Sequence, residues 1–159
     1  MNKFKTLLWL PVFLLAVISI AYATWSDTLS GVGPNISQRG VTYTQTFTWN
    51  PGSGTKILNQ IQYEWHANGG ACMDGNIPPA WKECRFPDGI SLKLCFKTTT
   101  NCVNVSTAEG WYANTAFAGQ TFDATSAKIY LKWFVSGTGS LSPVITGETN
   151  YASANYYSP

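Results

Sequence analysis

Hydrophobic and polar residues alternate with a period of two along four stretches of the chain, residues 41–49, 57–66, 90–97 and 129–136. In the first stretch every even position from 42 to 48 is Thr, and the odd positions are mostly aromatic or apolar. This period is typical of half-buried β-strands. In residues 129–136 both faces are largely apolar, which predicts a central strand or one covered on both sides. The tail 149–157 is expected to add a last strand.

The alternation also predicts which side chains are buried. It places Trp49, Trp65 and Trp133 inside the domain. In residues 57–66 it predicts that Ile57 lies on the buried face with Trp65, whereas Leu58 lies on the opposite face.

Turns rich in Gly, Pro and Asn separate these strands, and no stretch has a convincing helical period. The pattern predicts an all-β fold, a small antiparallel β-sandwich or barrel-like domain. Residues 66–88 have no periodicity and hold several Gly and Pro residues. They are too long for an ordinary connection, so we interpret them as an irregular insertion loop.

The first 23 residues have the three parts of a secretory signal peptide. Lys3 and Lys5 precede an apolar run from Leu7 to Ile20, and Ala21 and Ala23 form a small-x-small cleavage site. An uncleaved membrane anchor is the alternative, but the run is shorter than the about 20 apolar residues that a spanning helix needs. No later segment is apolar enough to span a bilayer, so residues 24–159 are expected to form one exported domain without a membrane span.

Charge is sparse in the predicted mature chain. Loss of Lys3 and Lys5 lowers the ten Lys and Arg residues to eight, which balances the eight Asp and Glu residues. No Lys or Arg cluster remains, which argues against nucleic acid as a partner.

All four cysteines, Cys72, Cys84, Cys95 and Cys102, lie in the exported part. An even number in an oxidising compartment predicts two disulfides, although four cysteines allow three connectivities. We expect neighbours to pair, Cys72 with Cys84 and Cys95 with Cys102. Their spacing does not suit a zinc site, and the single His66 has no His partner. No cofactor or metal is expected.

The hydrophobic pattern supports the second pairing independently. If Cys95 opposes Cys102 in an antiparallel hairpin, Leu94 opposes Val103 and Leu92 opposes Val105 on one face. The turn would then place β-branched Thr98 and Thr99 in a two-residue loop, which tight hairpins disfavour. A four-residue loop over 97–100 is therefore expected, with the ladder beginning at Phe96 and Asn101.

No catalytic constellation is evident. Glu64 and His66 are two residues apart on a predicted strand and share a face, as an acid–base pair would require. The same face carries Gln60 and Gln62, so an ordinary solvated surface is the simpler interpretation. Nothing in the sequence places a nucleophile beside His66, and we expect a protein without enzymatic activity.

Surplus aromatic residues offer a binding function instead. Trp111 and Tyr112 follow Gly110, and Trp81 lies in the insertion. Exposed aromatics stack on sugars or anchor protein partners, so these three side chains are predicted near a partner surface. The alternative is that they close the ends of the sandwich or pack under the insertion loop.

An ordered series of motifs resembles the FlhE family, periplasmic proteins encoded with flagellar export-gate genes. The series covers most of the mature chain and consists of Trp25, Arg39-Gly40, Tyr63-Glu64-Trp65, the run PDGISLKLC at 87–95, Cys102-Val103, GSLSP at 139–143, Asn150 and Asn155-Tyr156. Residues 67–86 and the tail beyond Tyr156 depart from that pattern.

The resemblance implies a non-enzymatic periplasmic accessory protein of the flagellar type III export apparatus. Its partners would be protein components of the export apparatus or basal body, and its role would be to limit proton leakage through the export gate or to act like a chaperone. An exported carbohydrate-binding or adhesive β-sandwich is the alternative, which low charge and many aromatics also suit.

We predict that the mature protein begins at Thr24, because Ala21 and Ala23 are the nearest small pair after the apolar run. Intact-mass measurement of protein recovered from the periplasm is the check. A membrane-bound form that retains Met1 would contradict it.

Overall fold

The computed structural model describes residues 22–68, 89–108 and 110–159, and every element in these ranges is a β-strand. All strand pairs are antiparallel. Within the described ranges no helix is long and apolar enough to cross a membrane. The strands are β1 (Thr24–Trp25), β2 (Leu29–Val32), β3 (Ile36–Gln38), β4 (Thr42–Trp49), β5 (Thr55–Trp65), β6 (Ala67–Asn68), β7 (Ile90–Phe96), β8 (Cys102–Val105), β9 (Gly110–Asn114), β10 (Thr121–Asp123), β11 (Ala127–Val135), β12 (Ser140–Gly147) and β13 (Thr149–Tyr157).

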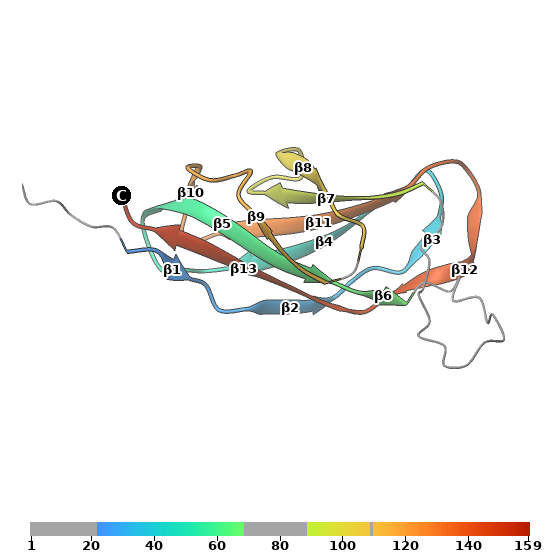
Figure 1. The fold of residues 1–159 in the computed structure, drawn as a ribbon, viewed down its shortest axis with the longest axis horizontal. Helices are drawn as coiled ribbons and strands as arrows, with labels where there is room; N and C mark the ends of the chain where they lie inside the picture. The colour runs from blue at the N-terminus through green and yellow to red at the C-terminus, as the bar shows by residue number, and fades with distance from the viewer. Residues whose placement is uncertain (1–21, 69–88, 109) are drawn as a thin grey trace, which may run out of the picture.

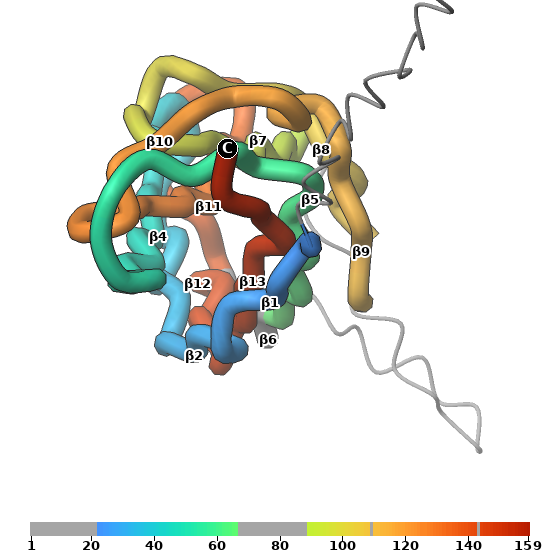
Figure 2. The backbone as a smooth tube through the Cα atoms, turned by 90° about the vertical axis from the view of Figure 1, so that its left-hand side faces the viewer, coloured from blue at the N-terminus to red at the C-terminus, as the bar shows by residue number. Residues whose placement is uncertain are grey.

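Two sheets pack face to face as a sandwich (Figure 1). Sheet 1 is built on the long strands β5 and β13; β1 and β2 follow one another along the free edge of β13, and β9 and β10 do so along β5. Sheet 2 has the order β4-β11-β7-β8. Seen end-on in Figure 2, β13 and β5 face β4 and β11 across the core. The predicted all-β sandwich is therefore confirmed.

The strand β11 is central in sheet 2, as its two apolar faces predict, with β4 on one side and β7 on the other. Its inner side chains meet those of sheet 1 in the core, where the rings of Trp65 and Trp133 lie 6.4 Å apart. Trp49, Trp65 and Trp133 are all buried, as predicted. Val41 falls outside β4 and is 39% exposed, so the first strand is one residue shorter than its pattern suggests.

The hairpin of β7 and β8 has the predicted register. Cys95 opposes Cys102, and the two form a disulfide with their Cα atoms 4.0 Å apart. The Phe96 N–H donates to the Asn101 carbonyl at 3.0 Å, which begins the ladder where expected. The residue that takes a positive φ, of 67°, is Lys97, so the β-branched threonines avoid it.

A third, small sheet of β3, β12 and β6 closes one end of the sandwich (Figure 1). Ile36 and Ile145, which oppose each other in it, are both buried in the core. The strand β6 pairs with β12 through Ala67 and Asn68. The predicted insertion loop at 66–88 therefore begins with a short strand; its residues 69–88, including Cys72, Trp81 and Cys84, lie outside the described residues, and the Cys72–Cys84 disulfide stays a prediction.

The prediction for the start of β5 was wrong. Leu58, expected outside, is 1% exposed and belongs to the core, whereas Ile57 is only partly buried. The cause is a β-bulge: Asn155 pairs with Gln60 and Tyr156 pairs with Leu58, which leaves Asn59 as an extra residue. An extra residue reverses the face of every side chain before it.

Asn150 provides a buried polar link between the two sheets. Its side chain is fully buried; its Nδ2 donates to Gln45 Oε1 of β4 at 2.7 Å, and its Oδ1 accepts the His66 backbone N–H at 2.6 Å. Gln45 Nε2 in turn donates to the Gly31 carbonyl of β2 at 2.7 Å. These three bonds join β13, β4, β2 and the end of β5 at one point in the core.

We expect Asn150→Ala to lower the free energy of unfolding by about 3 kcal/mol, because Gln45 Oε1 and the His66 N–H would each lose the partner that Asn150 provides. Denaturant unfolding of the purified domain measures it. Asn104→Ala is the control, since Asn104 is exposed on the outer face of β8 and should change stability by no more than about 0.5 kcal/mol. A loss below about 1 kcal/mol for Asn150→Ala would show that the Asn150 hydrogen bonds contribute little to the stability of the fold.

Candidate functional site

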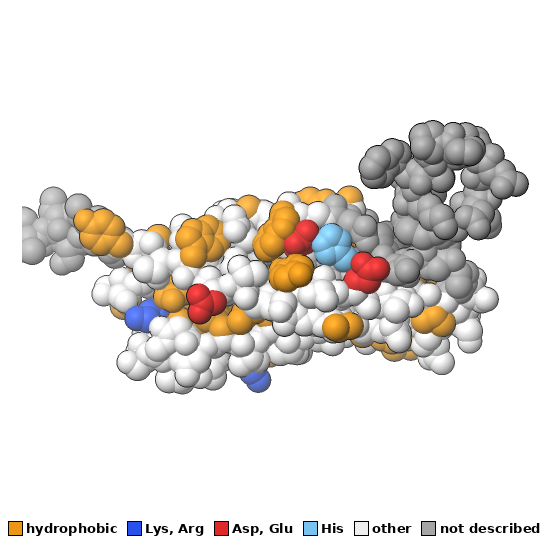
Figure 3. Space-filling view, turned by 90° about the horizontal axis from the view of Figure 1, so that it is seen from below, with side chains coloured by type: hydrophobic (Ala, Val, Ile, Leu, Met, Phe, Trp, Pro, Cys, Tyr) orange, Lys and Arg blue, Asp and Glu red, His pale blue; other side chains and the backbone are white. Residues whose placement is uncertain are grey.

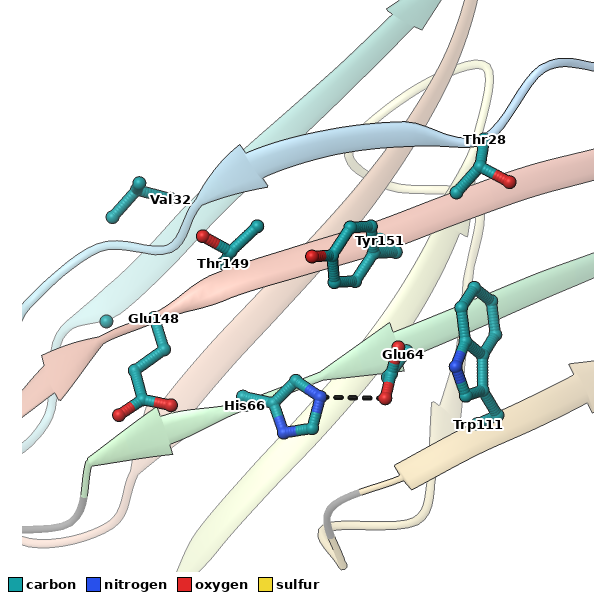
Figure 4. A pocket seen from close by; sticks show the side chains of 9 residues that line it. Thr28, Val32, Glu64, His66, Trp111, Glu148, Thr149 and Tyr151 are labelled. Atoms are coloured by element: carbon teal, nitrogen blue, oxygen red, sulfur yellow. Dashed lines mark hydrogen bonds and ion pairs between the residues drawn. The ribbon is translucent and has the colours of Figure 1, made fainter.

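The outer face of sheet 1 carries an open groove of about 880 Å³. It lies where β2, β13, β5 and β9 run side by side, near the end closed by the third sheet. Its chemistry comes from two carboxylates, one imidazole and two aromatic rings (Figure 4). The lining residues are Thr28, Val32, Glu64, His66, Trp111, Gly147, Glu148, Thr149 and Tyr151.

Strand register brings the aromatic side of the groove together. Glu64 of β5 opposes Trp111 of β9 on one side and Tyr151 of β13 on the other. The three side chains therefore form a row across the sheet on its outer face. The rings of Trp111 and Tyr151 stack with centroids 6.1 Å apart and planes 26° apart. Trp111 is 52% exposed, so about half of its surface is open to a partner although its ring stacks on Tyr151.

The polar side of the groove centres on His66. His66 Nε2 lies 2.8 Å from Glu64 Oε1, a hydrogen bond that becomes an ion pair when the imidazole is protonated. Glu148 lies on the other side of the imidazole (Figure 4), and Figure 3 shows the histidine between two acidic side chains with hydrophobic side chains beside them. The His66 backbone is held from below by Asn150, so the groove is anchored to the core link.

Trp111 and Tyr112, which the sequence groups together, point to opposite sides of β9. Trp111 faces the groove, whereas Tyr112 packs against the core and stacks on Tyr63 with ring centroids 5.5 Å apart. Burial, and then the neighbouring Tyr112 hydroxyl, raise the pKa of Tyr63 to about 12. A partner that contacts the groove would therefore meet Trp111 and not the body of the Tyr112 ring.

Sequence reasoning places Glu64 and His66 on one face, which is confirmed, but treats that face as ordinary surface. It does not find Tyr151 or Glu148 as parts of a site. The one available signal for Tyr151 was the strand expected over 149–157. That signal does not show which strand lies beside Tyr151, so it does not place the ring in the groove. Among the described residues, the His66 imidazole has no hydroxyl or thiol hydrogen-bonded to it, and no group of three or more His, Cys, Asp and Glu residues is placed to hold a metal ion.

The fold and the groove define an antiparallel β-sandwich with an acidic and aromatic surface site. A search of the solved structures finds the same fold in the crystal structure of FLHE, with a TM-score of 0.62 and 20% sequence identity over 84% of this chain and 96% of that one. The FlhE-like fold that the motif series predicts is thus confirmed. No family model and no curated protein matches the sequence.

We predict that Trp111 and Trp25 account for most of the quencher-accessible tryptophan emission of the described residues. Both side chains are about half exposed, whereas Trp49, Trp65 and Trp133 are buried. Acrylamide quenching of Trp111→Phe and Trp25→Phe variants should each show a smaller accessible fraction than the wild type. If Trp25→Phe lowers that fraction and Trp111→Phe does not, the exposed position of Trp111 is wrong.

Proposed function

We propose that this protein is a non-enzymatic periplasmic accessory protein of the flagellar type III export apparatus. The observation that carries the proposal is the FlhE-like sandwich found in a chain whose ordered motifs resemble the same family. The signal-peptide pattern suits export to the periplasm. In this role the protein limits proton leakage through the export gate, or acts like a chaperone for parts of the apparatus.

The groove suits binding rather than chemistry. A general acid–base pair needs a reacting group within hydrogen-bond reach, and among the described residues the His66 ring contacts only the Glu64 carboxylate by hydrogen bonds. An exposed Trp over a Tyr, beside carboxylates, is the composition of a recognition surface. We assign the contact with a partner in the export apparatus or basal body to this groove.

Carbohydrate binding is the second candidate, and one observation favours it. Trp111 shares the groove with Glu64 and with the hydroxyl-bearing Thr28 and Thr149, a combination that stacks on sugar rings and accepts hydrogen bonds from their hydroxyls. Gene context separates the two candidates: flagellar export-gate genes next to this one support the first, and polysaccharide genes support the second.

Deletion of the gene is expected to alter swimming or to let the cytoplasmic pH fall faster in acid medium, because protons would leak through an unregulated gate. Motility assays and a cytoplasmic pH reporter give the readouts, with the wild-type gene restored in trans as the control. Unchanged motility and pH in the deletion strain would contradict the proposal. A hydrolytic activity of the purified protein that His66→Ala abolishes without unfolding it would contradict the non-enzymatic part.

A further inference from the structure

The groove carries negative charge that the described residues do not balance. Two of its nine lining residues are glutamates, one is a histidine, and none is Lys or Arg. Glu64 is paired with His66, and the exposed Glu148 has no ion pair within the described ranges. A carboxylate in water is well solvated, so this excess alone requires no ligand. The position of these carboxylates in the same groove as an exposed indole does point to one kind of ligand, a cationic group.

The indole and the carboxylates favour the same chemical group. The face of a Trp ring attracts cations through its quadrupole, and Trp is the best of the aromatic residues at this. Glu64 directly opposes Trp111 in the strand register, so a cation that stacks on the indole lies on the same outer face of the sheet as a carboxylate. A planar guanidinium can stack on the ring and donate two hydrogen bonds to a carboxylate together, which the ammonium of Lys cannot do.

We propose that the groove binds the guanidinium of an arginine side chain on a partner protein, with Trp111 as the stacking face and Glu64 as the acceptor, while Glu148 across the imidazole adds to the negative charge of the groove. The identity of that partner as a flagellar component rests on the proposed function, but the recognition chemistry does not. Glu64, Trp111 and Tyr151 lie on paired strands with fixed register, and His66, held by Asn150, orients Glu64. The site is therefore organised before the ligand arrives, which lowers the entropic cost of binding.

The test uses the mature protein and a short peptide, acetyl-Gly-Arg-Gly-amide, with the citrulline peptide as a matched uncharged control. Binding is followed by NMR at the backbone amides of Glu64, Trp111 and Tyr151. One stacked, paired guanidinium is expected to bind with a Kd of roughly 1 mM. The citrulline peptide should bind roughly tenfold more weakly, and a Lys peptide should fall between the two.

Variants assign the contacts. Trp111→Ala and Glu64→Gln should each weaken binding of the Arg peptide by roughly tenfold. Trp25→Ala and Asp27→Asn are the matched controls, because they remove an exposed Trp and an acidic residue from a different hollow at the other end of the sheet. They should leave the shifts at the groove unchanged.

Equal binding of the Arg and citrulline peptides, no binding of either, or groove variants that bind like the wild type would each overturn the proposal. Preferential binding of a neutral oligosaccharide at the same amides would do so as well, in favour of a sugar site. These outcomes are separate from the deletion experiment. A motility defect in the deletion strain without binding of the Arg peptide would support the proposed function and contradict the arginine site. Binding of the Arg peptide without a defect in the deletion strain would support the arginine site and contradict the flagellar role.

Discussion

The buried Asn150 amide is the interaction on which both the packing of the sheets and the groove depend. Its partners come from the other sheet, through Gln45, and from the end of β5, through the His66 N–H. A buried amide costs free energy unless its donors and acceptors are paired, so a shift of β13 or β4 by one residue is penalised. Gly33 makes the site possible, because a Cβ there would lie 2.7 Å from Asn150 Nδ2.

The same link reaches the surface in two steps. Asn150 fixes the backbone of His66 where β5 ends, and the His66 imidazole then holds the Glu64 carboxylate at 2.8 Å. Glu64 is in turn aligned with Trp111 and Tyr151 by the registers of β9 and β13. A core interaction thus positions the polar half of the groove, and strand pairing positions the aromatic half. Glu148, in the connection between β12 and β13, and Thr28, just before β2, line the groove from outside the strands.

The local sequence pattern predicts the features that residues close together in the chain determine. The period of two finds the long strands, and the β7–β8 hairpin follows because its disulfide and its apolar pairs require one register. The bulge at Asn59 could not be foreseen, since Ile57 and Leu58 are both apolar and fit either face. The Trp111–Tyr151 stack depends on β9 and β13 both choosing β5 as a neighbour, a long-range pairing on which the sequence around each ring carries no information.

The two outer faces of the sandwich differ in charge, and this difference orients a cationic partner. Among the described residues, the outer face of sheet 2 carries Lys93 directly opposite Lys132, with Lys128 further along β11, whereas the groove on sheet 1 carries Glu64 and Glu148. Charges on the two outer faces are further apart than the about 10 Å between the sheets, and through solvent they are separated by more than the Debye length of about 8 Å at physiological salt. Each face therefore presents its own sign to an approaching molecule. A segment that carries arginine is repelled by the lysine face and drawn to the groove, so charge selects the face of approach while Trp111 supplies the contact.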